Sequence, residues 1–139
     1  MPDIGLTHIA LPVRNLDASL RFYKRYAGLE VVHRRKVQQS GWEVAWISDK
    51  TRPFVVVLVQ GPEVTNPLLR DGHLGVACES REEVDRRFAQ AESEGCLIVK
   101  QPEDVGGPVG YTALFKDPDG HTLELSFGQD VTLAVQKAK

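Results

Sequence analysis

The chain has 139 residues, of which 42% are hydrophobic and 26% are charged, and its formal net charge is -2. These values are typical of one soluble domain, or of two half-sized modules that share a core. The net charge disfavours a nucleic-acid or anionic-membrane partner, since either would favour a basic face. The sequence has no apolar run long enough to span a bilayer and no signal-peptide pattern, so we expect a cytoplasmic protein.

The first half of the chain, about residues 4–60, predicts a β-α-β-β-β module. Its opening strand, Leu6–Val13, alternates so that aliphatic side chains face one side and His8 faces the other. Asn15 is a typical N-cap and Gly28 suits the left-handed position after a helix, which predicts a helix from about Leu16 to Tyr26. Turn-forming residues then separate three predicted strands: Leu29–Val37, Trp42–Ile47 and Phe54–Val59.

The second half repeats this order over about residues 72–128, after a linker of about residues 61–71 that has no periodicity. His73–Cys78 is the opening strand, and Ser80 with Glu83 forms a capping box for a helix that ends at Gly95. The remaining predicted elements are the strands Cys96–Lys100, Tyr111–Lys116 and Thr122–Phe127, a glycine-rich loop over Asp104–Gly110, a tight turn over Asp117–Gly120, and a tail of residues 129–139 that is a helix or an ordered arm.

Two histidine-led strands and one lone acid carry the chemistry of this repeat. His8 and His73 occupy the same place in the two opening strands, and Glu124 in the second closing strand stands at nearly the same spacing as Val57 in the first. Imidazole and carboxylate suit Zn, Fe, Mn, Ni or Co, and three protein ligands leave positions open for water or substrate. We therefore predict a divalent metal site built from His8, His73 and Glu124. The alternative is that these histidines are structural.

Other residues offer a pocket wall. Trp42 and Trp46 share a strand face, so they are either core filler or the aromatic wall of a pocket that also includes Val57 and Thr112. Such a pocket would suit a hydrophobic or planar substrate.

Three smaller features have expected roles outside this site. His121 is expected at the surface or stabilising the hairpin, and His33 is expected to be solvated. The glycines of the loop, Gly106, Gly107 and Gly110, could let it close over a site, although a flexible turn is the default. Cys78 and Cys96 match no zinc or redox spacing, so both are expected to be reduced, with Cys78 buried.

The same segments carry a family resemblance that spans about residues 4–127. The run from His8 to Val13, the helix start from Leu16 to Tyr23 and the pair Gly28-Leu29 resemble the first module of the vicinal oxygen chelate superfamily. Gly72-His73-Leu74 and the stretch from Asp117 to Leu125 are similar to its second module. The superfamily includes glyoxalases, bleomycin-resistance proteins, fosfomycin-resistance enzymes, epimerases and ring-cleaving dioxygenases.

The resemblance implies an α+β fold of two tandem βαβββ modules, with a curved mixed sheet around a central site and helices on its convex side. It also implies a homodimer whose subunits can share metal ligands. The four ligand places of the family fall on His8, Val57, His73 and Glu124. Valine can neither ligate a metal nor move a proton, which disfavours glyoxalase I and epimerase activity.

The remaining two-histidine, one-glutamate set is similar to that of fosfomycin-modifying enzymes and extradiol dioxygenases. The segment Pro102–Pro108 is acidic or neutral, which disfavours phosphonate binding there. We therefore expect a metal-dependent lyase or dioxygenase that chelates adjacent oxygen atoms of a small substrate, with Glu124 and Tyr111 as catalytic groups. The alternative is a binding protein that sequesters a drug without catalysis, like the bleomycin-resistance members.

Overall fold

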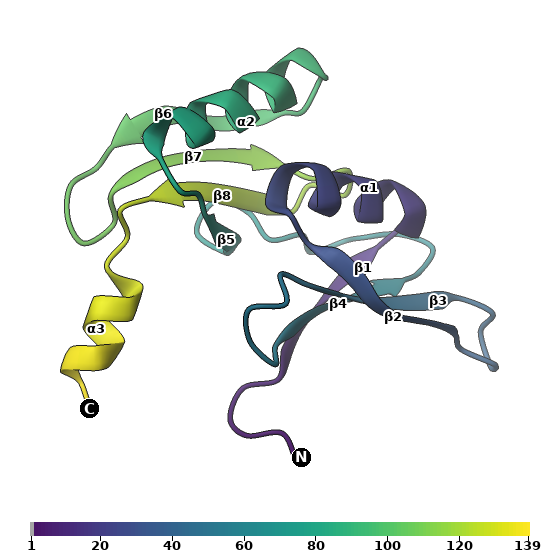
Figure 1. Cartoon of the computed structure of the whole chain (residues 1–139). Helices are drawn as coiled ribbons and strands as arrows, with labels where there is room; N and C mark the ends of the chain where they lie inside the picture. The colour runs from purple at the N-terminus through teal and green to yellow at the C-terminus, as the bar shows by residue number, and fades with distance from the viewer. Residues whose placement is uncertain (1) are drawn as a thin grey trace. The chain divides into compact units, whose positions relative to one another are not determined.

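The structure is a computed structural model that describes residues 2–139. Over these residues the chain forms three helices and two four-stranded mixed sheets, which confirms the predicted α+β class. The chain divides into two compact units, with the boundary between Pro67 and Leu68. Each unit has one sheet and one long helix, in the predicted β-α-β-β-β order (Figure 1).

Unit 1 has the strand order β1-β4-β3-β2, in which β1 and β4 are parallel and the other pairs are antiparallel. Its helix lies across one face of this sheet (Figure 1). The observed ends differ from the predicted ones by one or two residues, because strand ends are set by partners that the local pattern does not reveal. The elements are β1 (His8–Val13), α1 (Leu16–Ala27), β2 (Glu30–Lys36), β3 (Glu43–Ser48) and β4 (Val55–Gln60).

The helix α1 is capped as its sequence predicts. The Asn15 side chain accepts a hydrogen bond of 3.1 Å from the Ala18 backbone N–H, and Gly28 ends the helix at a φ of 66°. The buried face of the helix packs on alternate residues of the strands. Each large apolar side chain stabilises the fold by roughly 1.5–3 kcal/mol when it is fully buried. The large side chains of this core are Leu11, Val13, Leu16, Phe22, Tyr23, Tyr26, Ile47, Val56 and Leu58.

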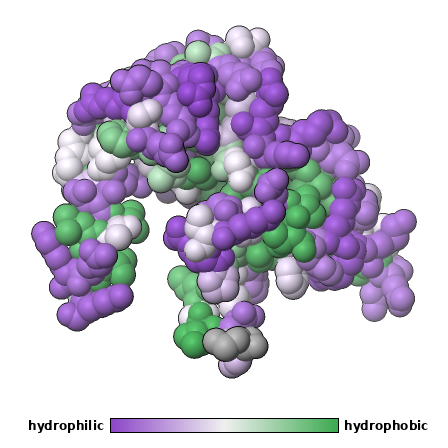
Figure 2. All heavy atoms as spheres, in the orientation of Figure 1, coloured by the Kyte–Doolittle hydropathy of each residue, from purple (hydrophilic) through white to green (hydrophobic). Residues whose placement is uncertain are grey.

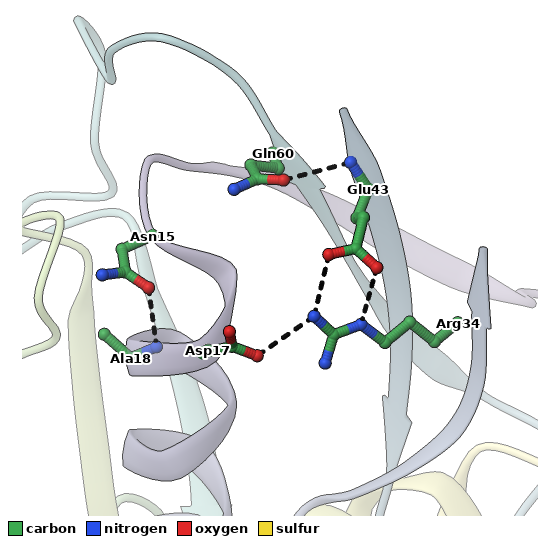
Figure 3. Close-up of polar contacts among 6 residues, drawn as sticks. All are labelled: Asn15, Asp17, Ala18, Arg34, Glu43 and Gln60. Atoms are coloured by element: carbon green, nitrogen blue, oxygen red, sulfur yellow. Dashed lines mark hydrogen bonds and ion pairs between the residues drawn. The ribbon is translucent and has the colours of Figure 1, made fainter. Parts of the chain in front are cut away.

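An arginine on β2 ties the start of α1 to the sheet (Figure 3). Arg34 donates two hydrogen bonds to the carboxylate of Glu43, at 2.9 and 3.1 Å, and its Nη2 lies 3.0 Å from Asp17 Oδ1. The Glu43 and Asp17 carboxylates raise the pKa of Arg34, and the Arg34 guanidinium lowers the pKa of Glu43. Because the side chains on a strand alternate, the neighbouring Arg35 faces the other side of the sheet.

Unit 2 repeats the topology of unit 1, with the strand order β5-β8-β7-β6 and a parallel β5–β8 pair. The Ser80 hydroxyl accepts from the Glu83 N–H as predicted, and the Glu83 carboxylate accepts in turn from the Glu79 N–H. Phe88 of the helix packs edge-on against Phe115, with their ring centroids 6.4 Å apart. The elements are β5 (His73–Ala77), α2 (Arg81–Ser93), β6 (Ile98–Asp104), β7 (Tyr111–Lys116), β8 (Thr122–Phe127) and α3 (Val131–Lys137).

The glycine-rich loop between β6 and β7 is a closed turn. The N–H groups of Val109 and Gly110 both donate to the Gly106 carbonyl, and Val105 N–H donates to the Gly110 carbonyl. At Gly110 the φ is 84°, and a Cβ atom would lie 2.5 Å from the Phe127 carbonyl oxygen. Only glycine fits such a position, so Gly110 fixes this turn against the end of β8.

The His121 side chain is almost fully buried, at 1% exposure. Of the two expected roles, the surface position is therefore wrong. Its Nδ1 accepts a hydrogen bond of 2.9 Å from the Leu68 N–H, and the Leu68 carbonyl accepts one of 2.6 Å from the Thr122 N–H. These bonds attach the chain that follows Pro67 to the start of β8. The turn Asp117–Gly120 forms as predicted, and Asp117 accepts from the His121 N–H at 2.9 Å.

The tail forms the short helix α3, whose apolar side chains are exposed. Val131, Leu133 and Val135 are 62%, 47% and 54% exposed, and Figure 2 shows hydrophobic atoms on this helix. Within residues 2–139, no helix combines the length and the apolar character needed to cross a membrane.

We predict that His121→Ala lowers the free energy of unfolding by about 2–4 kcal/mol, because it creates a cavity and leaves the Leu68 N–H without its acceptor. Urea denaturation at neutral pH measures this change. The control is His33→Ala, whose half-buried ring lies 4.6 Å from the Trp46 ring and whose loss should cost less than about 1 kcal/mol. Equal effects of the two substitutions would contradict an anchoring role for His121.

Candidate functional site

The parallel β5–β8 pair brings two of the predicted ligands together. Gly75 pairs with Glu124 and His73 pairs with Thr122. Glu124 is therefore two residues along β8 from the partner of His73, and both side chains lie on the same face of the sheet. Alternation places both side chains on the face opposite α2, because Leu123 and Leu125 occupy the helix-covered face. His73 Nε2 lies 3.5 Å from Glu124 Oε2. We call the side of this sheet that carries Glu124 the open face of unit 2, meaning only that α2 does not cover it, since Thr112, Thr122 and Glu124 on this side are buried.

The hydrogen bonds of His73 fix which ring nitrogen faces the acid. Its Nδ1 lies 2.9 Å from the Arg70 carbonyl oxygen, and since a carbonyl can only accept, Nδ1 carries the proton. In the neutral ring Nε2 therefore directs a lone pair toward the carboxylate. An imidazole nitrogen and a carboxylate oxygen bound to one tetrahedral metal, with bonds of about 2.1 Å, would lie about 3.4 Å apart. The observed separation of 3.5 Å fits a shared metal ion.

Glu124 is held by a partner that the sequence did not suggest. The Gln129 side chain donates a hydrogen bond of 2.8 Å to Glu124 Oε1, which leaves Oε2 on the His73 side. The carboxylate is buried, at 7% exposure for the residue, and a buried carboxylate is costly without compensating contacts. The hydroxyl oxygen of Thr122, beside His73, is also buried and has no hydrogen-bond partner among residues 2–139. These features suit a site that receives a further polar group.

The third predicted ligand belongs to the other unit. His8 opens β1, is exposed, and has its Nδ1 2.9 Å from the Thr7 hydroxyl. Its place in unit 1 matches that of His73 in unit 2, because β1 pairs with β4 as β5 pairs with β8. In the same register Ala10 pairs with Val57, so Val57 stands at the equivalent of Glu124. No cluster of three or more His, Cys, Asp or Glu side chains suited to a metal occurs within residues 2–139.

The equivalent face of unit 1 is apolar and aromatic. Trp46 pairs with Val57 and lies opposite the helix-covered face, and it is 37% exposed. The His33 ring lies 4.6 Å from the Trp46 ring, and the Arg35 guanidinium stands 5.9 Å from its centroid. Trp42, just before β3, is also exposed. Both tryptophans are therefore available to a ligand rather than core filler.

Tyr111 lies on the opposite side of its sheet from Glu124. It alternates with Thr112, and its hydroxyl donates a hydrogen bond of 2.5 Å to Asp85 on α2, while the Arg81 guanidinium stacks over its ring. This contact holds the hydroxyl on the helix side, so Tyr111 is left out of the candidate site. Thr112, by contrast, is on the open face of unit 2 and is buried.

One cation on this open face was not foreseen from the sequence. Lys100 on β6 donates a hydrogen bond from its Nζ to the Thr112 hydroxyl. The sequence pattern could not place it, because the register of β6 shifts on both sides of Lys100. The open face of unit 2 thus carries an imidazole, a carboxylate, an ammonium group and buried hydroxyls.

Comparison with known proteins identifies the family of the chain and several relatives. A family model described as the Glyoxalase/Bleomycin resistance protein/Dioxygenase superfamily matches residues 5–125. An uncharacterised protein of Pseudomonas aeruginosa is 39% identical over 127 residues, covering 89% of each chain. A lactoylglutathione lyase of Arabidopsis thaliana is 27% identical over 120 residues, which are 85% of this chain but only 42% of that protein.

Solved structures of related fold were also found. A protein of Bacillus cereus described as a possible glyoxalase has a TM-score of 0.69 and 27% identity, covering 89% of this chain and 99% of that chain. The fosfomycin resistance protein FosX of Listeria monocytogenes, solved as a mutant with Mn(II) and a dihydroxypropylphosphonic acid, has a TM-score of 0.72. It is 20% identical and covers 94% of this chain and 97% of that chain, so it shares the fold.

We predict that the stability conferred by the Tyr111 hydroxyl depends on pH. The hydrogen bond to Asp85 raises the pKa of Tyr111 above its ordinary value of 10.0. The contribution is therefore complete below about pH 10, the unfolded-state pKa, and is lost as the pH rises through the higher folded-state pKa. Urea denaturation should show Tyr111→Phe to be less stable than the wild type at pH 8, with a gap that closes as the pH rises through the folded-state pKa. In an Asp85→Asn background the closing of the gap should move to lower pH, and an unchanged profile there would contradict this origin.

Proposed function

Because the chain belongs to the Glyoxalase/Bleomycin resistance protein/Dioxygenase superfamily, we propose that it is a divalent-metal-dependent enzyme acting on a small molecule with adjacent oxygen atoms. The observation that carries this proposal is the His73–Glu124 pair, whose facing Nε2 and Oε2 atoms are 3.5 Å apart. The metal would be Fe, Zn, Mn, Ni or Co, all of which accept imidazole and carboxylate ligands. The FosX structure with Mn(II) supports a metal in this family.

His73 and Glu124 are the proposed ligands from unit 2, and His8 is the proposed third ligand. Its equivalent place in the opening strand of unit 1 supports this role, and it comes either from the same chain or from a second copy. We infer a homodimer, for which the exposed apolar side chains of α3 offer contact surface. Light scattering of the purified protein tests that assembly.

The proposed chemistry follows from an open metal coordination sphere. When bound, the metal would act as a Lewis acid that binds two neighbouring substrate oxygens and polarises them. The chain itself holds the site in place: Arg70 fixes the His73 ring and Gln129 fixes the Glu124 carboxylate. The apolar face with Trp42, Trp46 and Val57 would receive a hydrophobic or planar part of the substrate, and Thr112 belongs to the polar side of the pocket.

The reaction type is a lyase or a dioxygenase. Several relatives are named lactoylglutathione lyase, a name for the isomerisation of a glutathione adduct, and the Arabidopsis protein is more than twice the length of the matched region. Val57 stands at the place equivalent to Glu124 and cannot supply a ligand or a base. We therefore propose lyase chemistry that does not need a protein acid at that place, rather than isomerisation of a glutathione adduct.

We predict about one equivalent of a transition metal per chain when the untagged protein is analysed by plasma mass spectrometry. His73→Ala and Glu124→Gln should each lose it, because each removes one of the two facing ligands. His8→Ala should weaken metal binding, and the control His33→Ala should not, since His33 packs on Trp46.

These outcomes distinguish a metal-dependent enzyme from a drug-sequestering protein. If no metal binds, even after reconstitution at neutral pH, the catalytic proposal fails and a drug-sequestering protein becomes the better explanation. That alternative predicts tight binding of a metallated planar drug with no turnover. Quenching of the Trp42 and Trp46 fluorescence would measure this binding. Normal metal affinity in His8→Ala would remove His8 alone from the ligand set.

We predict further that Gln129→Ala weakens metal binding by about 10–100-fold without unfolding the protein, because an outer partner orients the ligand carboxylate. Competition with a fluorescent chelator measures the affinity. Gln129→Glu should be worse than Gln129→Ala, since it would place a second carboxylate against Glu124 Oε1. An affinity equal to that of the wild type would show that Glu124 needs no orienting partner.

A further inference from the structure

A hollow lies between the helix α1 and the edge strand β2 of unit 1, and we call it the α1–β2 hollow. Its volume is about 380 Å³, at the lower end of the range for small-molecule sites. Val31 of the hollow pairs with Ile47, whose side chain is buried under α1, whereas Trp46 next to it faces the other side of the sheet. The hollow is therefore on the opposite side of this sheet from the apolar face that carries Trp46.

Part of the lining is aliphatic and only half covered. It consists of Leu20 on α1 and of Leu29 and Val31 at the start of β2. Leu29 is buried, Leu20 is half-buried, and Val31 is 45% exposed. Covering such a surface with an apolar group removes it from water, which is favourable.

The rest of the lining is charged: Arg21, Lys24 and Lys50 are cations, and Glu30 is the one carboxylate among the lining residues. Three positive charges against one negative charge leave a surplus of two, in a chain whose formal net charge is -2. Lys50 Nζ lies 3.0 Å from Glu30 Oε2, and both side chains are exposed, so this ion pair is weak and can exchange for another anion. The hydrogen bond and charge of Lys50, with the charge of Lys24, lower the pKa of Glu30.

The two cations on α1 are not neutralised by the protein. Among residues 2–139, neither Arg21 nor Lys24 forms an ion pair with a carboxylate. The usual partner for Arg21 on a helix would be Asp17, four residues earlier, but Asp17 lies 3.0 Å from Arg34 Nη2 instead (Figure 3). The last carbonyls of α1, which would repel an anion, already accept hydrogen bonds from the N–H groups that follow the helix.

Lys50 has a backbone conformation that is rare for a lysine. Its φ is 64°, and it is the only non-glycine residue with a positive φ among residues 2–139. Its N–H donates a hydrogen bond of 2.9 Å to the hydroxyl of Ser48, which is buried. Glycine or asparagine adopts this conformation with less strain, and strained backbone is concentrated at sites that bind ligands. The strain favours a role for the Lys50 side chain in binding.

We propose that the α1–β2 hollow binds a small amphipathic oxyanion, in which a phosphate or carboxylate group is joined to a compact apolar body. Arg21, Lys24 and Lys50 bind the oxyanion through charge-assisted hydrogen bonds, and the apolar body lies on Leu20 and Val31. A molecule with both parts uses the whole lining, whereas an inorganic anion or a neutral apolar compound uses only half of it. The inference does not rest on the proposed function, because no proposed metal ligand takes part.

The test titrates the metal-free full chain, labelled with ¹⁵N, with phenyl phosphate, phenol and inorganic phosphate. Phenyl phosphate should shift the backbone amide signals of Arg21, Val31 and Lys50, with an affinity about tenfold or more above those of phenol and of phosphate. Tighter binding of benzoate than of phenyl phosphate would assign a carboxylate as the anionic group, and the reverse would assign a phosphate. No shift at these amides, or an equal affinity for phenol, would overturn the proposal.

Variants of the charged lining should have effects of opposite sign. Lys24→Gln should weaken binding of phenyl phosphate by about three- to tenfold, because it removes a cation. Glu30→Gln should strengthen binding by a similar factor, since it removes the one acid of the lining and releases Lys50. Arg86→Gln is the matched control, because it removes an exposed arginine from α2 of the other unit and should leave the affinity unchanged. Equal affinities of Lys24→Gln and Glu30→Gln would contradict an anion site in the hollow.

Lys50→Asn separates binding from folding. Asparagine tolerates a positive φ better than lysine does, so urea denaturation should show no loss of stability. The affinity for phenyl phosphate should nevertheless fall by about three- to tenfold, because the ammonium group is lost. Wild-type affinity in this variant would remove Lys50 from the proposed site.

Discussion

The parallel pairing of an opening strand with a closing strand is the constraint on which the candidate site depends. β5 and β8 are separated in sequence by a helix and two strands, yet their register places His73 one step from Glu124. A slip by one residue would turn Glu124 into the core and Leu123 or Leu125 onto the open face. Burial of an unpaired carboxylate among Phe88 and its neighbours would be costly, so the hydrophobic core under α2 also fixes the position of the acid.

The fold tolerates a buried carboxylate because each of its oxygens has a neighbour. Gln129 donates to Oε1, which offsets the cost of removing that oxygen from water, and His73 faces Oε2. The contact with His73 is of a different kind, since a neutral Nε2 and a carboxylate are both acceptors. That side is satisfied only by a proton on the ring or by a cation between the two atoms. A metal ion bound between the two atoms would satisfy both of them.

Much of this architecture could be predicted from local pattern, and the exceptions share a cause. Asn15, Gly28, Ser80 and the Asp117–Gly120 turn act through neighbours in sequence, and each forms as the sequence predicts. His73 and Glu124 could be paired because the repeat fixes their strands. Lys100 and Gln129 could not be foreseen, since the first depends on a bulge and the second on the path of the chain after β8. The side chain of Tyr111 follows strand alternation. Its placement on the face opposite Glu124, however, could be assigned only once the side of the sheet covered by α2 was known.

The two halves show how one backbone pattern can support different surfaces. In unit 1 the places on the open face pair Val44 with Val59 and Trp46 with Val57, whereas in unit 2 the equivalent places pair Thr112 with Ser126 and Leu114 with Glu124. Because side chains alternate along a strand, exchanging valine for threonine on this face changes its polarity and leaves the residues that pack on the helix side unchanged. A duplicated module can therefore assign ligand chemistry to one copy and apolar contact to the other, while both keep the core that holds their strands in register.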